Sequence, residues 1–352
     1  MESFITDDGT VAKFVHDDCS ETAVKVVKSC SSFIEDDRVR LEWVDRNKYS
    51  VFISSSLGCY MRCPFCHLTI KDSQYRKLQA KAVLDNVKEA ILHEVERRPS
   101  IRTRYAKLCW MGMGDAVNQP GMVHDVTLEL MEWLMREQLA VGLDCVDLST
   151  VLPPVKDSWM TWFSALDKAL QPYPLNPLSY RMEQAELATQ SQYAGRSRFR
   201  MFWSVHSAVQ TTRDKMVPGG MPLPRALEQL RAFAQQGPNL LLHQLFVEGL
   251  NDCDAEVEAL LGLLRENFAD NELRVLRYNF CDRSPYREWS SVDAAVARIA
   301  RRHARLKVQV SAGKEIAAAC GQFLVAAPKS VYTRISVVPV ASAEHAPVRW
   351  AR

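Results

Sequence analysis

Three closely spaced cysteines constrain this chain more than any other feature of its sequence. Cys59, Cys63 and Cys66 stand in the pattern C-x3-C-x2-C. Three thiolates with this spacing can bind three irons of a [4Fe-4S] cluster and leave the fourth iron open to a further ligand. A zinc site is a weaker interpretation, because zinc needs a fourth ligand and His67 is badly placed to complete a tetrahedron. The remaining alternative is that the three cysteines are buried as small hydrophobic side chains.

Length and composition are those of a soluble globular protein. The chain has 352 residues, 47% of them apolar and 24% charged, which suffices for one large core with a small appendage. No apolar run approaches the length of a membrane span, and the acidic start (residues 1–8) fits neither a signal peptide nor a transit peptide. Ten cysteines without a secretory signal favour a reducing compartment. We therefore expect a cytoplasmic protein, or an organellar one if its transit signal is atypical or removed.

The net charge is only +2, so the overall field does not mark a nucleic-acid-binding protein. Basic residues are nevertheless dense in two stretches. One contains Arg196, Arg198 and Arg200, and the other runs from Arg298 to Lys307. For the second stretch, a solvated helix face is favoured over a specific contact with RNA.

Strand-like and helix-like segments alternate from residue 49 onward. Strands are expected at 49–54, 105–111, 143–148, 199–206, 240–246, 273–278 and 307–310. Helical apolar spacing occurs at 80–98, 122–139, 159–170, 223–235, 255–267 and 292–306. Such βα units predict an α/β fold with a parallel sheet flanked by helices, and an incomplete (β/α) barrel is the form we expect.

We expect three parts along the chain. Residues 1–48 form a β-rich N-terminal extension, residues 49–325 the barrel domain, and residues 326–352 a loose tail. Prolines and a polar run indicate an inserted loop at 171–197. Residues 316–323 are expected to be helical.

Polar residues follow several of the expected strands, where barrels of this kind place their catalytic groups. These residues are Gly112 and Gly114 with Asp115, then Ser149, then Ser204 with His206, then Asn279. Glycines allow close backbone approach, Asp115 can pair with an ammonium group, and the others supply short polar groups. For His206, a core histidine bonded to the backbone is the alternative.

Motifs in matching order make the chain resemble the RlmN/Cfr family of radical S-adenosylmethionine (SAM) methyltransferases, which methylate adenine carbons of RNA. The resemblance spans about residues 50–325. It rests on the cysteine motif with its lead-in Ser54–Gly58, and on Arg76-Lys77-Leu78, Met111-Gly112-Met113-Gly114-Asp115, Leu148-Ser149-Thr150, Ser204-Val205-His206, Val217-Pro218, Asn251-Asp252, Asn279 and Ala319-Cys320-Gly321-Gln322.

The resemblance implies a radical SAM barrel with a [4Fe-4S] cluster on Cys59, Cys63 and Cys66. It implies SAM contacts from Gly114, Asp115, Ser149, Ser204, His206 and Asn279. Cys320 would carry a methyl group taken from one SAM, and a radical made from a second SAM would abstract hydrogen from it, so that the carbon adds to an RNA adenine. Implied partners are rRNA or tRNA and an electron donor such as flavodoxin or ferredoxin, and we expect a monomer.

The chain departs from the family pattern at four points. Only 58 residues precede Cys59, so we expect the family's helical N-terminal RNA-binding domain to be absent. Asp115 replaces the family's glutamate, and Gln309 stands where arginine is usual. Phe52 stands where the family has a second functional cysteine, which resolves the protein–RNA adduct. Cys281 is the best substitute, because it follows Asn279 on an expected rim loop, whereas Cys109 lies inside a strand and should be buried.

These departures leave two alternatives open. One is a radical SAM enzyme redirected to another substrate. The other is an RNA- or ribosome-binding assembly factor that retains the cluster without catalysis.

Overall fold

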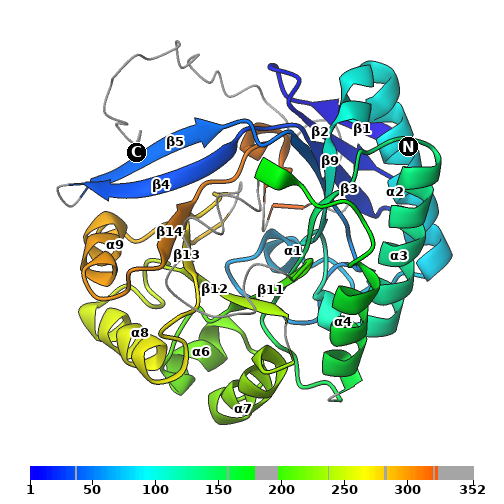
Figure 1. Cartoon of the computed structure of the whole chain (residues 1–352). Helices are drawn as coiled ribbons and strands as arrows, with labels where there is room; N and C mark the ends of the chain where they lie inside the picture. Colours follow the sequence, from blue (N-terminus) through cyan, green and yellow to red (C-terminus); the bar gives the residue numbers. More distant parts are fainter. Residues whose placement is uncertain are drawn as a thin grey trace.

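The computed structural model describes residues 1–35, 38–156, 158–178, 197–236, 238–280, 284–319 and 322–323. Its centre is a ten-stranded sheet, curved as Figure 1 shows. In spatial and chain order its strands are β1 (Glu2–Ile5), β2 (Val11–Val15), β3 (Glu21–Lys25), β6 (Lys48–Phe52), β9 (Tyr105–Trp110), β10 (Leu143–Thr150), β11 (Phe199–Ser204), β12 (Asn239–Leu245), β13 (Leu273–Leu276) and β14 (Leu306–Gln309).

From β6 to β14 every neighbouring pair of strands is parallel. The sheet begins at β1 and ends at β14, so the part of the chain that the structure describes forms an open, incomplete barrel. The sequence-based prediction of this fold is confirmed. The antiparallel strands β1–β3 extend the barrel sheet, because β3 pairs with β6.

Helices cover the outside of the curved sheet (Figure 1). They are α2 (Ala80–Arg97), α3 (Pro120–Arg136), α4 (Ser158–Ala169), α6 (Gln210–Met216), α7 (Leu223–Ala234), α8 (Asp254–Asn267) and α9 (Val292–Ala300). Shorter elements are α1 (His67–Ile70) and the 3-10 turns η1 (Pro99–Thr103), η2 (Ala116–Asn118) and η3 (Lys314–Ile316). None of the helices described is both long enough and apolar enough to pass through a membrane.

Two small hairpins complete the fold. β4 (Ser29–Glu35) pairs with β5 (Arg38–Val44), and this hairpin reaches across to lie against β14 (Figure 1). β7 (Ser56–Leu57) pairs with β8 (Arg76–Lys77) and brackets the cysteine loop and α1.

Side chains alternate along the barrel strands between two environments. On β6, Tyr49 and Val51 are fully buried in the apolar layer between sheet and helices. Ser50 and Phe52 face the barrel interior instead. This period of two is what a strand backbone imposes. It places Phe52 directly beside its register partner Cys109 on β9.

Two expected helices are wrong in part. The helix expected at 292–306 ends at Ala300, because the chain must turn before β14 begins at Leu306. Residues 316–323 are not a helix in their described portion. Ala317 adopts a left-handed φ of 51°, which stops η3 after a single turn.

The two basic stretches differ in environment. Arg298 and Arg302 bind carboxylates of α8, with Arg298 2.6 Å and Arg302 2.8 Å from Glu258. The helix-face interpretation of that stretch therefore holds for these two residues. Arg200 points into the barrel interior, and Arg196 lies outside the described residues.

Candidate active site

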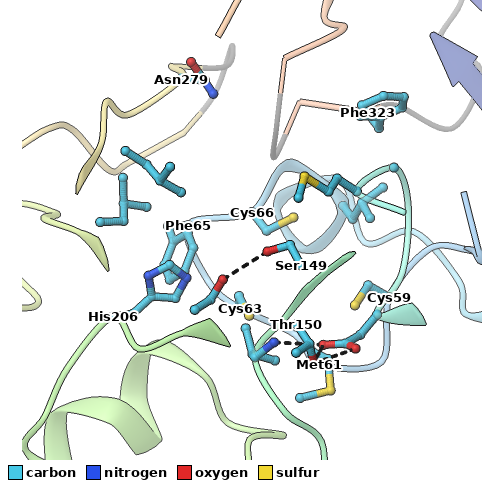
Figure 2. A pocket seen from close by; sticks show the side chains of 18 of the residues that line it. Cys59, Met61, Cys63, Phe65, Cys66, Ser149, Thr150, His206, Asn279 and Phe323 are labelled. Atoms are coloured by element: carbon cyan, nitrogen blue, oxygen red, sulfur yellow. Dashed lines mark hydrogen bonds between the residues drawn. The ribbon is translucent and has the colours of Figure 1, made fainter. Parts of the chain in front are cut away.

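The cysteine loop connects β7 to α1 and opens into a cavity at the end of the barrel. Gly58 begins the loop at a φ of +56°, and a Cβ there would lie 2.6 Å from the carbonyl oxygen of Gln74. Only glycine fits so close a turn. Cys59, Cys63 and Cys66 all line the cavity (Figure 2). The sequence-predicted metal ligands are thus brought together.

A [4Fe-4S] cluster and a single metal ion make different demands on three thiols. Among the described side chains, no group of three His, Cys, Asp or Glu residues converges closely enough to hold one metal ion. Thiolates that each bind a different iron of a [4Fe-4S] cube need not converge on one point. Burial, together with the charge of Cys66, raises the pKa of Cys59 and of Cys63. A bound cationic metal centre would reverse that effect.

Asp115 lies beside the cysteines and is held by neighbouring donors. Its carboxylate accepts hydrogen bonds from the Thr150 hydroxyl at 2.9 Å and from the Val151 amide at 2.9 Å. It also accepts one from the Val117 amide at 3.2 Å, which starts η2. Burial raises its pKa to about 6, although these hydrogen bonds oppose the shift. The carboxylate is buried, ionised at neutral pH and placed at the cavity wall.

The glycines before Asp115 allow a close approach within the protein. Gly114 has a φ of +89°, and a Cβ there would overlap the hydroxyl oxygen of Ser56. At Gly112 a Cβ would lie 2.6 Å from the hydroxyl oxygen of Ser54. The Met111–Asp115 loop therefore packs directly on the serine lead-in of the cysteine loop.

Short polar groups line the next part of the cavity wall. The hydroxyl oxygens of Ser149 on β10 and Ser204 on β11 are 3.3 Å apart (Figure 2). His206 follows β11 with a left-handed φ of 56°. Its ring meets Phe65 edge-on at 5.2 Å, and within the described structure its Nδ1 has no hydrogen-bond partner. Burial lowers its pKa to about 3, so the ring is neutral.

The alternative for His206 was a core histidine whose polar groups are bonded within the protein. Its main-chain carbonyl is bonded in this way, but its ring is not. The His206 carbonyl accepts hydrogen bonds from the amides of Gln244 at 2.9 Å and Asn251 at 2.5 Å. Its ring instead faces the cavity (Figure 2).

No family model matches the chain. The chain is 28% identical over 295 residues to a probable dual-specificity RNA methyltransferase RlmN of Synechococcus sp. strain RCC307, covering 82% of this chain and 73% of that protein. It is 25% identical over 280 residues to the corresponding protein of Prochlorococcus marinus strain NATL2A, covering 78% and 67%.

The chain is a distant homologue of RlmN.

A solved structure shares the fold. A radical SAM methyltransferase from Sphaerobacter thermophilus superimposes with a TM-score of 0.58 at 20% identity, over 92% of this chain and 80% of that one. This chain therefore has the radical SAM fold, to which a [4Fe-4S] cluster and SAM belong as cofactors.

In the C-terminal part of the site, the structure describes the chain up to Ala319 and then Gln322 and Phe323. Cys320 and Cys281 lie outside the described residues. Phe323 is buried and lines the cavity (Figure 2). Gln322 donates a hydrogen bond to the Phe280 carbonyl at 2.6 Å. Asn279 lines the same cavity and donates to the Ser311 hydroxyl at 3.3 Å.

Phe52 stands where the RlmN/Cfr pattern has its second cysteine, and a lysine lies over its ring. The ammonium of Lys25 lies 4.2 Å from the centre of the Phe52 ring. Cys109, opposite Phe52, is buried as predicted, and burial raises its pKa to about 11.

Sequence reasoning missed two residues beside the site. Thr150 belongs to the Leu-Ser-Thr motif, yet its role as the hydroxyl donor to Asp115 appears only in the structure. His243 on β12 lies 3.4 Å from Ser149. Leu241, His243 and Leu245 stand at every second position of β12 and therefore share one face of the strand. This spacing is the sequence signal that places His243 inside the barrel.

Proposed function

We propose that this protein transfers a methyl-derived carbon from SAM, by way of Cys320, to an adenine carbon of RNA. The observation that carries the proposal is the single cavity lined by the three cysteines, Asp115, Ser149, Ser204 and His206. Support also comes from the relatives, whose names are those of RNA methyltransferases. A cytoplasmic location and an electron donor such as flavodoxin or ferredoxin belong to the same proposal.

Each group of residues has a task in this proposal. Cys59, Cys63 and Cys66 would hold the cluster, which together with SAM supplies one-electron cleavage of SAM when both are bound. The Asp115 carboxylate would pair with the ammonium of SAM, since a charge-assisted bond in a buried site is strong. Ser149, Ser204 and Asn279 would orient its carboxylate, ribose and adenine.

His206 and the apolar wall would keep the reacting groups away from water. The neutral ring of His206 packs on Phe65. Leu245, Leu276 and Phe323 line the same cavity. Excluding water protects a reactive carbon radical from side reactions.

The deciding experiment is anaerobic reconstitution followed by incubation with methyl-labelled SAM, a reductant and total RNA. We expect label in methyladenosine after digestion of the RNA to nucleosides. The Cys320→Ala variant should bind SAM and iron but transfer no label, and mass spectrometry should find the added methylene on the Cys320 peptide of the wild type before RNA is added.

The second candidate is a radical SAM enzyme redirected to a substrate other than RNA. Phe52 favours it, because a phenyl ring beneath Lys25 supplies no thiol to release a bridged adduct. Release of 5′-deoxyadenosine without label in RNA would select this candidate. Absence of both products would select the non-catalytic assembly factor.

A further inference from the structure

A buried arginine lies beside the wall of the cavity that the three cysteines line, which we call the cysteine cavity. Arg213 belongs to α6 and is 1% exposed. Its guanidinium donates hydrogen bonds to the carbonyls of Val151 at 2.7 Å, Ser204 at 3.1 Å and Val205. Val151 and Ser204 line the cysteine cavity, whereas Arg213 does not. The guanidinium therefore lies outside the cavity, against the ends of two strands that form part of its wall.

This guanidinium is a buried positive charge without a carboxylate partner. Within the described part of the chain Arg213 forms no ion pair with an Asp or Glu, and its Nε has no hydrogen-bond partner. The adjacent Asp214 is exposed and accepts a hydrogen bond from Gln210 at 2.6 Å. Burial lowers the pKa of Arg213 to about 10, which leaves it charged at neutral pH.

The neighbours of Arg213 offset only part of the cost of burying its charge. Three carbonyls accept its hydrogen bonds, and the centre of the Trp203 ring lies 5.3 Å from its guanidinium carbon. Such dipoles and ring faces stabilise a cation, but a buried charge is costly unless an opposite charge accompanies it. The carbonyls themselves require donors and not a charge. The positive charge of Arg213 therefore calls for an anion nearby.

The segment that follows α6 connects Arg213 to the cysteine loop. A Cβ on Gly219 would lie 3.2 Å from the Cα of Met61, and a Cβ on Gly220 would lie 3.5 Å from the Nη2 of Arg213. The last residue of α6 packs in one apolar cluster with Cys63. Burial raises the pKa of Cys63 above its usual range, and the charge of Arg213 opposes that rise. The guanidinium and the cysteine loop are thus within electrostatic reach of each other.

The cysteine loop supplies negative charge when its cofactor is bound. Three thiolates outweigh the positive charge of an oxidised [4Fe-4S] core, so the site as a whole is anionic, and one-electron reduction makes it more anionic. A buried cation nearby stabilises the reduced state more than the oxidised state, because the attraction grows with the opposite charge and is weakly screened inside a protein.

We infer that Arg213 is the counter-charge of the [4Fe-4S] cluster and raises its reduction potential. A low-potential one-electron donor supplies the electron, and Arg213 neither exchanges a proton nor forms a bond in that step. The inference rests on the radical SAM cofactors and holds whichever substrate the enzyme uses, so it goes beyond the proposed function.

The test is a redox titration of the reconstituted holoprotein without SAM or RNA, followed by the electron paramagnetic resonance signal of the reduced cluster. Arg213→Gln removes the charge and retains an amide donor, Arg213→Met removes both, and Arg213→Lys retains the charge. Arg265→Gln is the control, because Arg265 on α8 is exposed and lies outside the cysteine cavity. The iron content of every variant is measured before its titration.

We expect Arg213→Gln and Arg213→Met to lower the reduction potential by about 59 mV, which is a tenfold change in the ratio of reduced to oxidised cluster. Arg213→Lys should keep this ratio within about twofold of the wild type, and Arg265→Gln should leave it unchanged because exposed charges are screened. A merely structural role would lower the potential in Arg213→Lys as well, since an ammonium cannot reproduce the planar fork of a guanidinium.

A wild-type potential in both neutral variants would overturn the inference. An equal fall in Arg213→Lys would also overturn it, because the hydrogen bonds and not the charge would then set the potential. If the neutral variants bind no iron, a full cluster at the wild-type potential in Arg213→Lys supports the counter-charge, and loss of iron there too overturns it.

These outcomes are separate from those that test the proposed function. A lowered potential in the neutral variants, with no methylation of RNA by the wild type, would support the counter-charge and reject the proposed function. Methylation of RNA by the wild type, with equal potentials in all variants, would support the proposed function and reject the counter-charge.

Discussion

At Asp115, burial and hydrogen bonding act on one carboxyl group in opposite directions. Burial is the larger effect and raises the pKa to about 6. The folded protein therefore holds this proton more tightly than the unfolded chain does. The unfavourable contribution of the ionised group to stability is present above pH 6, and it disappears as the pH falls from about 6 towards 3.8.

The first prediction concerns SAM affinity and pH. The ammonium of SAM should bind the ionised carboxylate, so affinity should fall by about tenfold between pH 7 and pH 5, where the group is mostly protonated. Asp115→Asn should remove this dependence and weaken binding at pH 7 by about tenfold or more. Equilibrium dialysis with labelled SAM measures the pH dependence of affinity and the affinity of the variant at pH 7. An equally steep pH profile in the variant would exclude Asp115 as the group responsible.

The second prediction concerns the cysteines. The anaerobically reconstituted protein should contain about four irons per chain, as one cube requires. Cys63→Ala should lose most of this iron, whereas Cys253→Ala should retain it because Cys253 is exposed and outside the cavity. Iron analysis and the visible absorption of the cluster report the result. Two irons or fewer in the wild type, or stoichiometric zinc, would contradict the cluster.

At the scale of elements, β3 is tied to the segment that precedes Cys320. The ammonium of Lys25 donates to the carbonyls of Ala312 at 2.9 Å and Ala318 at 2.7 Å. Lys13 on β2 donates to the Ala317 carbonyl at 3.4 Å and pairs with Glu21 at 2.8 Å. Residues 312–318 thus receive their position from two lysines of the N-terminal strands.

The third prediction is that Lys25→Met slows methylation of Cys320 in the absence of RNA. The buried Ala318 carbonyl would lose its Lys25 donor, at a cost of about 1–3 kcal/mol, the half-buried Ala312 carbonyl would lose it too, and the segment before Cys320 would shift. SAM affinity should stay within about twofold, because Lys25 does not line the cysteine cavity. Mass spectrometry of the Cys320 peptide over time measures the rate. Lys28→Met is the matched control, and equal rates in all three proteins would disprove this positioning role.

The whole molecule depends on β1–β3 as part of its main sheet. All residues of β2 and β3 are buried, and Phe14 and Val24 lie in the main core. Removing these strands would expose the edge of β6 and apolar surface on α2.

The fourth prediction is that deletion of residues 1–25 yields insoluble or unfolded protein. The large buried apolar side chains lost are Val11, Phe14, Val15 and Val24. At about 1.5–3 kcal/mol each, their loss is comparable with the roughly 5–15 kcal/mol that stabilises a domain. Deletion of residues 1–5 is the control, because the side chains of β1 are mostly exposed. Thermal unfolding followed by circular dichroism compares the variants. A cooperative transition near that of the full chain in the larger deletion would refute the prediction.

Local patterns predicted much of this molecule. The spacing of Cys59, Cys63 and Cys66 predicted that the three thiols share one site, and they line one cavity. The alternation of strand and helix patterns predicted the barrel. Contacts between distant strands were not predictable in this way. The sharing of Asp147 by Lys107 and Arg200 depends on the register of three strands, and Thr150 meets Asp115 only after β10 pairs with β9. The left-handed φ of Ala317, whose carbonyl accepts a hydrogen bond from the distant Lys13, has no signal in the local sequence.

The bonds of Lys25 and Lys13 to residues 312–318 also bear on how the protein is made. They join partners separated by 287, 293 and 304 residues in the chain. Contacts of such long range form only after nearly the whole chain has left the ribosome. Until then, these lysines lack these partners, and Ser311 and Phe323, which line the cysteine cavity on either side of the segment, are not yet in place. The cysteine loop is therefore synthesised well before the residues that complete its cavity.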